Sequence, residues 1–188
     1  MTNYPFRIPQ DHKDIEAVNY YNTVVDAGGN EAAALAGLAK MSRDNARTPM
    51  QWDAGPNAGF TTGNPWLPVN PNYAWLNAAA QIGGTDTVFA HYQALIRLRH
   101  ELSILVEGDF TPMMEDDPQI WAYFRTTSSA KLLVIANCGR EPRTVEIGRE
   151  WIAADLVLGS LPGAPGASMS TSLDLAGWDA RMYYAAGR

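Results

Sequence analysis

The stretch Ser42–Tyr73 is the feature that most restricts how this chain can fold. It reads SRDNARTPMQWDAGPNAGFTTGNPWLPVNPNY, with neither the three- to four-residue period of a helix nor the alternation of a strand. Loops longer than about 12–15 residues inside a compact domain are usually functional or disordered. Disordered segments are poor in aromatic residues, whereas this stretch contains Trp52, Phe60 and Trp66. We therefore expect an ordered loop that carries recognition chemistry.

Composition excludes several classes of function. The 188 residues carry a formal net charge of −6, with a pI of about 5.0, whereas nucleic-acid-binding domains need a basic face. The single cysteine, Cys138, cannot form an internal disulfide bond, which fits a reducing, cytoplasmic compartment. No apolar run approaches the ~20 residues of a membrane span, and the N-terminus has no apolar signal core. We expect a cytoplasmic protein with no nucleic acid and no membrane among its partners.

Helical periodicity precedes the long loop. Apolar residues recur at three- and four-residue steps from Asp14 onward, and Gly28-Gly29 is expected to end this first helix. Asn30 is the expected N-cap of a second helix, over residues 32–41, which is rich in Ala and Leu.

A third helix is predicted after the loop, over residues 87–102. Thr85 or Asp86 is its expected N-cap. It has a wide apolar stripe, which predicts a large partner surface. The stripe consists of Val88, Phe89, Tyr92, Leu95, Ile96 and Leu102.

From Ile104 onward the apolar period changes to two. The candidate strands cover residues 105–113, 120–125, 131–137, 143–146, 155–158, 170–175 and 180–185. Short strands separated by turn residues predict an antiparallel β-sandwich. The run from Leu132 to Ile135 is apolar at every position, so we expect this strand to be central.

The chain is thus expected to divide into two parts, residues 1–103 with helices and the long loop, and residues 104–188 with a small β domain. The helices of the first part have apolar faces, but no strands or helices precede them in this sequence to cover those faces. A domain that lacks its partner surface is usually part of a larger domain.

A dense block of residues resembles the C-terminal third of glycoside hydrolase family 13, the alpha-amylase family. The block comprises SRDNARTPMQWD at 42–53, NAGFTTG at 57–63, Pro65-Trp66 and VNPNY at 69–73. The resemblance is closest to the oligo-1,6-glucosidase and α-glucosidase branch, which also contains dextran glucosidase, trehalose-6-phosphate hydrolase and sucrose isomerase. It extends over nearly the whole chain, since Asp14-Ile15-Glu16, YQALIRLR at 92–99 and KLLVIAN at 131–137 follow in the expected order.

The resemblance implies a particular fold. Family members are (β/α)₈ TIM barrels followed by a C-terminal antiparallel β domain. This chain would then be an α+β fragment, with residues 1–103 as the last part of the barrel, including the active-site loop 42–73 and the final helix. Residues 104–188 would be the β-sandwich domain. Barrel active sites lie at the loop face of the barrel.

The resemblance also implies a chemistry. Members of the family are retaining enzymes with a nucleophilic Asp and a general-acid Glu about 5–5.5 Å apart, plus a third Asp that holds sugar hydroxyls. All three are expected upstream of Met1, so no catalytic residue, no metal ligand and no cofactor is assigned to this chain. The substrate-binding assignment goes to Arg47, the second Arg of RDNART, which would reach glucose in the non-reducing-end subsite. A guanidinium group offers several fixed donors for this task; the alternative is a structural Arg paired with an acidic neighbour.

Other residues of the loop receive structural interpretations. Arg43 and Asp44 are expected to be scaffolding, paired with each other or with the barrel. Trp52, Phe60 and Trp66 could stack on sugar faces, but packing within the loop is the favoured interpretation.

These features predict the C-terminal part of a retaining α-glucosidase that hydrolyses short α-glucosides. Its partners would be the oligosaccharide substrate and the missing N-terminal barrel portion, and the 188 residues alone would be inactive. One alternative is a non-catalytic β-sandwich module that caps a barrel or binds glucan. Another is part of a related glucosyltransferase or of a sucrose- or trehalose-isomerising enzyme.

Overall fold

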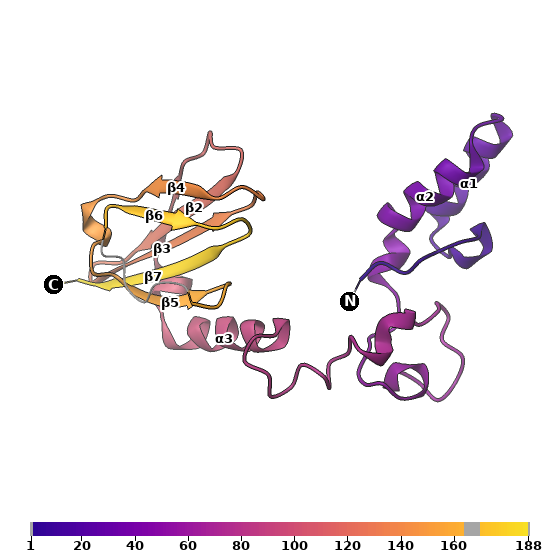
Figure 1. The fold of residues 1–188 in the computed structure, drawn as a ribbon, viewed down its shortest axis with the longest axis horizontal. Helices are drawn as coiled ribbons and strands as arrows, with labels where there is room; N and C mark the ends of the chain where they lie inside the picture. The colour runs from indigo at the N-terminus through magenta and orange to yellow at the C-terminus, as the bar shows by residue number, and fades with distance from the viewer. Residues whose placement is uncertain (1, 164–169, 188) are drawn as a thin grey trace. The chain divides into compact units, whose positions relative to one another are not determined.

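The computed structural model describes residues 2–163 and 170–187. Two compact units follow each other along the chain, with the boundary between Gly84 and Thr85. Figure 1 shows helices in both units and antiparallel sheets in the second, so the chain has the expected α+β composition. No helix of the described residues is long and apolar enough to cross a membrane.

Two packed helices lead into the loop in the first unit. Helix α1 (Ile15–Asp26) and helix α2 (Glu31–Met41) lie against each other. The Oδ1 atom of Asn30 accepts a hydrogen bond from the backbone N–H of Ala33 at 2.9 Å, which confirms the predicted cap of α2.

The segment from Ser42 to Tyr73 is ordered by hydrogen bonds although it contains no long helix or strand. Its short 3₁₀ turns are η2 (Arg43–Ala46), η3 (Pro56–Gly59) and η4 (Pro71–Ala74); η1 (Pro9–Asp11) precedes α1. Ala58 and Leu67 are fully buried, and the backbone N–H groups of Trp52 and Asp53 both donate to the carbonyl of Ala58. Gln51, also buried, donates to Asn72 and to the carbonyl of Leu76. These contacts confirm the prediction of an ordered loop.

The second unit contains a five-stranded antiparallel sheet in the order β1-β2-β3-β7-β5 and a two-stranded sheet, β4-β6. The five strands are β1 (Asp109–Met113), β2 (Ile120–Thr126), β3 (Ala130–Asn137), β7 (Ala180–Ala186) and β5 (Asp155–Gly159). The pair consists of β4 (Arg143–Glu146) and β6 (Ser172–Leu175). Strand β3 lies at the centre of the larger sheet, as its uninterrupted apolar run predicted (Figure 1).

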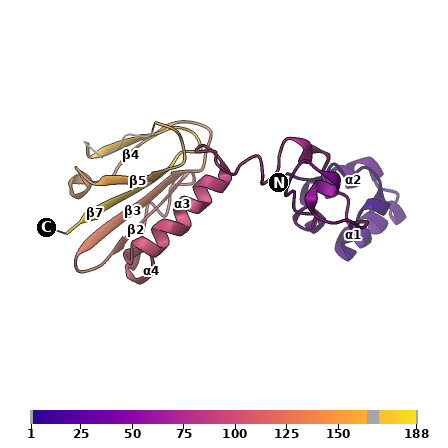
Figure 2. The same ribbon diagram turned by 90° about the horizontal axis from the view of Figure 1, so that it is seen from below.

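The larger sheet is buried on both faces around β3. Leu133 and Ile135 face a core shared with Val145 of β4 and Leu175 of β6. Leu132 faces the opposite way, into a core with α3 (Val88–Glu101) and α4 (Ile104–Glu107). Figure 2 shows α3 along this second face of the sheet.

Helix α3 differs from its prediction at its start and in its stripe. Its N-cap is Thr87, whose hydroxyl accepts from the N–H of Ala90, so the expectation of Thr85 or Asp86 is wrong by one or two residues. The apolar stripe is divided between two environments. Leu95, Leu98 and Leu102 pack on the sheet, whereas Val88, Phe89, Tyr92 and Ile96 are exposed. By its contacts α3 belongs to the second unit, and its assignment to the end of a barrel remains a prediction.

The predicted strand at 105–113 is wrong in its first half. Residues Ile104–Glu107 form α4, and β1 begins at Asp109. The reason is a contact with β2. The guanidinium of Arg125 donates to the carbonyls of Ile104 (3.0 Å) and Gly108 (2.7 Å), and the side chain of Ile104 is buried in the core under α3. Tertiary contacts therefore outweigh the β propensity of this segment.

Candidate functional site

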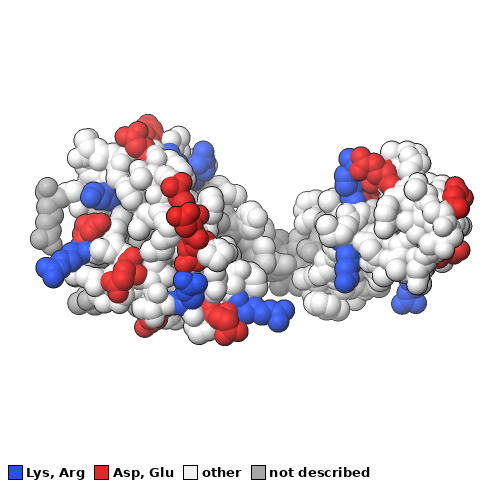
Figure 3. Space-filling model, turned by 90° about the horizontal axis from the view of Figure 1, so that it is seen from above, with Lys and Arg blue, Asp and Glu red and all other residues white. Residues whose placement is uncertain are grey.

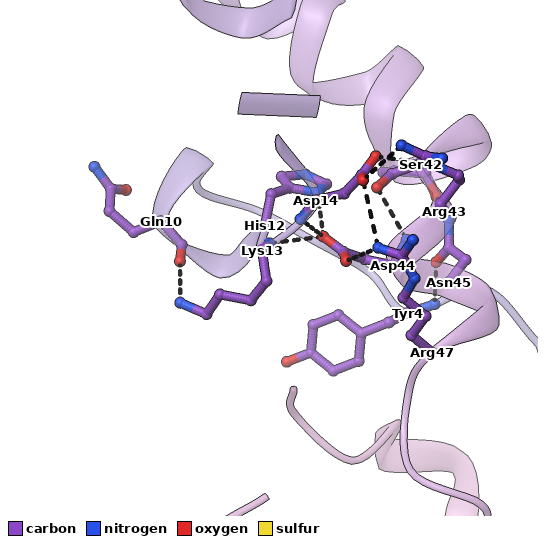
Figure 4. A network of polar contacts seen from close by, with 11 residues as sticks. Tyr4, Gln10, His12, Lys13, Asp14, Ser42, Arg43, Asp44, Asn45 and Arg47 are labelled. Carbon is purple, nitrogen blue, oxygen red and sulfur yellow. Dashed lines mark hydrogen bonds and ion pairs between the residues drawn. The ribbon is translucent and has the colours of Figure 1, made fainter. Parts of the chain in front are cut away.

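Charged side chains gather where the start of α1 meets the η2 turn of the long loop (Figure 4). Asp14, the residue before α1, accepts from two arginines of the loop. Nη2 and Nε of Arg43 lie 3.1 and 3.4 Å from its oxygens, and Nη1 of Arg47 lies 3.3 Å away. The side chain of Asp14 is 6% exposed, and those of Arg43 and Arg47 are 52% and 41% exposed. A buried carboxylate thus lies beneath two half-exposed guanidinium groups.

Asp44 fastens the loop to the beginning of α1. Its side chain is fully buried, and Oδ2 accepts from the backbone N–H groups of Lys13 (2.7 Å) and Asp14 (2.9 Å). Oδ1 lies 3.7 Å from Nη1 of Arg47. The scaffolding role expected for Asp44 therefore agrees with its contacts. We call Asp14, Arg43, Asp44 and Arg47 the charged cluster.

Arg43 does not pair with Asp44, so that possibility is wrong. It forms ion pairs with Asp14 and, at 3.0 Å, with Glu16 in the first turn of α1. The Glu16 side chain is 74% exposed. Sequence reasoning gave Glu16 no role, because nothing in the spacing of the two segments shows that the start of α1 and η2 lie side by side.

Asp14 and Arg43 stabilise each other's charged forms. Burial alone would raise the pKa of Asp14, but the hydrogen bonds and positive charge of Arg43 and Arg47 outweigh burial and hold this pKa below its ordinary value. The same bond to Asp14, with the negative charge of Glu16, raises the pKa of Arg43.

Arg47 combines the two interpretations that the sequence left open. It pairs with acidic neighbours, as a structural arginine would. Within the described residues, however, both ion pairs use Nη1 alone, so Nε and Nη2 remain able to donate to a further acceptor. A half-exposed guanidinium in this state can hydrogen-bond neighbouring hydroxyl groups of a ligand.

The packing interpretation of the three large aromatic residues of the loop is wrong for this chain. Trp52, Phe60 and Trp66 are 54%, 45% and 59% exposed. The interior of the loop is filled by Ala58 and Leu67, around backbone hydrogen bonds, which leaves the large rings outside.

A shallow hollow of about 200 Å³ adjoins the charged cluster. Its lining includes Glu16, Tyr20, Met41 and Arg43, so polar and apolar side chains both face it. On the face shown in Figure 3, basic side chains are scattered singly among acidic ones and form no basic surface for a nucleic acid. In the described part of the chain, no three His, Cys, Asp or Glu side chains are grouped to hold a metal ion.

Comparison with known proteins identifies the family of this chain. The family model "Alpha amylase, catalytic domain" matches residues 11–108, which include the whole charged cluster. The chain belongs to the alpha-amylase family, glycoside hydrolase family 13. Its relatives at about 40% identity include oligo-1,6-glucosidases.

Three relatives illustrate the match. Oligo-1,6-glucosidase of Halalkalibacterium halodurans is 39% identical over 185 residues, which cover 97% of this chain and 33% of that protein. Trehalose-6-phosphate hydrolase of Bacillus subtilis is 45% identical over 137 residues, 73% of this chain and 24% of that protein. The structure of trehalulose synthase MutB from Pseudomonas mesoacidophila MX-45 is 41% identical, with a TM-score of 0.87 over 98% of this chain and 33% of that one. The chain spans a third or less of the length of these relatives.

Proposed function

We propose that this chain forms one wall of the substrate site of a retaining α-glucosidase, and that Arg47 binds the glucose unit there. The observation that carries the proposal is the pair of half-exposed guanidinium groups on the buried carboxylate of Asp14. A fixed set of N–H donors suits the hydroxyl groups of a sugar, and the cluster lies inside the region that matches the catalytic domain.

The chain contributes binding in this proposal, and the rest of the enzyme contributes the reacting carboxylates. Retaining glycosidases need one carboxylate free to attack the sugar and a second that carries a proton to the leaving group. Asp14 and Asp44 are committed otherwise, because they accept hydrogen bonds from arginines and from backbone N–H groups. We therefore expect residues 1–188 alone to be inactive.

We also propose that residues 1–103 complete a (β/α)₈ barrel and that residues 104–188 form the family's C-terminal β-sandwich domain. Two observations support this assignment. The match to the catalytic domain extends through α3 to residue 108, and α3 exposes Val88, Tyr92 and Ile96 on the side away from its contacts with the sheet. Such a face is typical of a helix that packs on further structure.

A cytoplasmic location is part of the proposal. Cys138 is a free and exposed thiol, a state that a reducing compartment preserves.

A chimeric enzyme tests the function directly. Residues 1–188 replace the matching third of the H. halodurans oligo-1,6-glucosidase, and glucose release from isomaltose is measured. We expect hydrolysis, and we expect Arg47→Lys to lower kcat/KM by roughly 10- to 100-fold, because a planar fork of donors is replaced by a point charge. Arg43→Lys is the matched comparison. If only Arg43→Lys impairs hydrolysis, the sugar contact belongs to Arg43 and the assignment of Arg47 is wrong.

Two further assays separate the alternatives. Residues 1–188 alone should release no p-nitrophenol from p-nitrophenyl α-glucoside. Turnover that survives repurification would contradict the proposal that the reacting carboxylates lie in the rest of the enzyme. The similarity to a trehalulose synthase supports a second candidate, an enzyme that transfers glucose to a sugar instead of to water. Isomeric disaccharides from sucrose, in place of glucose and fructose, would identify that activity in the chimera.

A further inference from the structure

Asp14 occupies a helix N-cap but does not cap the helix. An aspartate at this position normally accepts a hydrogen bond from a backbone N–H of the first turn. Asn30 does so at the start of α2, whereas the side chain of Asp14 makes no capping bond at the start of α1. Its carboxylate is therefore free of the capping role and makes other contacts.

That carboxylate is divided between the two loop arginines. Oδ1 accepts from Arg43 at 3.1 Å and from Arg47 at 3.3 Å, and Oδ2 accepts from Arg43 at 3.4 Å. One buried carboxylate thus contacts both guanidinium groups at once. A charge-assisted bond to a carboxylate restricts a guanidinium more than water does.

The backbone at Asp14 is also held in place. The backbone N–H of Asp14 and that of Lys13 both donate to Oδ2 of Asp44, which is fully buried. Asp44 in turn belongs to the same 3₁₀ turn as Arg43. The backbone of Asp14 is therefore held by the same loop whose arginines its carboxylate contacts.

We propose that Asp14 is a positioning residue: it restrains the guanidinium groups of Arg43 and Arg47, and so keeps Arg47 in the direction needed to bind an α-glucoside. The identity of the ligand, an α-glucoside, rests on the proposed function. The contacts between Asp14 and the two arginines do not. Binding by side chains that are already ordered loses less conformational entropy, so removal of the carboxylate weakens sugar binding without removal of either donor.

The dynamics of the arginine side chains test the positioning role of Asp14 without an activity assay. The rotation of each guanidinium about its Nε–Cζ bond is measured by NMR in ¹⁵N-labelled residues 1–188. Arg7, which is exposed and forms no ion pair among the described residues, is the internal reference. Arg43 and Arg47 should rotate slower than Arg7 by roughly fivefold or more. Equal rates for all three in the folded wild-type chain would overturn the proposal, whether or not any variant folds.

Variants then test the cause. Asp14→Asn should speed the rotation of both arginines, and that of Arg47 most, because Arg43 keeps its ion pair with Glu16 at 3.0 Å. Asp26→Asn, at the exposed end of α1, should leave both rotations unchanged. If Arg43 and Arg47 stay slow in a folded Asp14→Asn chain, another group positions them and the proposal is wrong.

A double-mutant cycle in the chimeric enzyme tests the link to sugar binding. Asp14→Asn should raise KM for isomaltose about tenfold with a smaller change in kcat, and Asp14→Glu should restore part of the loss. Combined with Arg47→Lys, the two effects should be less than additive, because Asp14 acts through the arginine. Fully additive effects would refute action through Arg47. A lack of activity in the wild-type chimera, or of any effect of Arg47→Lys, would count against the proposed function, while the NMR result would still decide the positioning role.

Discussion

Nη2 of Arg143 lies 2.6 Å from Oδ2 of Asp117, and this ion pair joins the turn before β2 to strand β4 of the smaller sheet. Oδ1 of the same aspartate accepts from the backbone N–H groups of Gln119 and Ile120. One carboxylate thus orders the start of β2 and connects the two sheets that enclose the core of the second unit.

Asp117 should make the stability of the second unit depend on pH. The backbone N–H groups of Gln119 and Ile120 lower its pKa most; burial acts in the opposite direction, and Arg143 adds to the lowering. A carboxyl whose pKa is lowered by folding stabilises the protein above its unfolded pKa of about 3.9, and this contribution is lost as the pH falls through the folded pKa.

The measurement is thermal unfolding of the wild type and of Asp117→Asn between pH 7 and pH 2. The variant should have the lower Tm at pH 7, and the two curves should converge at the acid end. Asp116→Asn, one residue earlier and exposed, is the control and should follow the wild type. A Tm difference that stays constant across the range would show that the charge of Asp117 is not the cause.

The long loop should depend on Gly59. This residue has φ +67°, a conformation that costs an L-residue about 1–2 kcal/mol. A Cβ there would also lie 2.5 Å from Oδ2 of Asp53, whose other oxygen accepts from the N–H of Gly55. Gly59→Ala should therefore lower the free energy of unfolding of the first unit by about 1–2 kcal/mol.

Gly63→Ala is the matched control for the loop. A Cβ at Gly63 would meet only Thr61 Oγ1, at 3.8 Å, so a change within about 0.5 kcal/mol is expected. Urea unfolding followed by tryptophan fluorescence measures both variants. Equal stability of the two would mean that the backbone at position 59 is not constrained in solution.

The β strands could be predicted because their signals are local. Alternation and the apolar run from Leu132 to Ile135 gave the strands and the central place of β3, and Asn30 marked the start of α2. Helix α4 could not be predicted, because it depends on Arg125, which comes from β2, about twenty residues further along the chain.

The charged cluster could be predicted only in part. The RDNART block drew attention to Arg43 and Arg47, but the carboxylate that both contact comes from the start of α1. An aspartate directly before a helix predicts an N-cap. The sequence therefore predicts a capping bond for Asp14 and gives no sign of its contacts with the arginines. The contact depends on the loop lying against the start of α1, which cannot be deduced from the spacing of residues in the sequence.

The core of the second unit should be sensitive to a single truncation at Leu133. This side chain is fully buried in β3 between the two sheets. Leu133→Ala should lower the free energy of unfolding by about 2–5 kcal/mol, since the removed methyl groups leave a cavity that rigid neighbouring strands cannot fill. Lys131→Ala, exposed on the same strand, should change it by less than about 0.5 kcal/mol. A small loss at Leu133 would mean that the two sheets do not close tightly on β3.

The exposed half of the stripe on α3 should make the isolated chain associate with itself. Val88, Tyr92 and Ile96 are 67%, 62% and 57% exposed, while Leu95 and Leu98 hold the helix on the sheet. Contiguous apolar surface of this kind favours association in water. The sedimentation coefficient of residues 1–188 should therefore rise with concentration. Tyr92→Glu should suppress this rise without loss of the fold, because its side chain is outside the core, whereas Gln93→Glu should leave it unchanged. A wild-type chain that stays monomeric at every concentration would contradict the prediction.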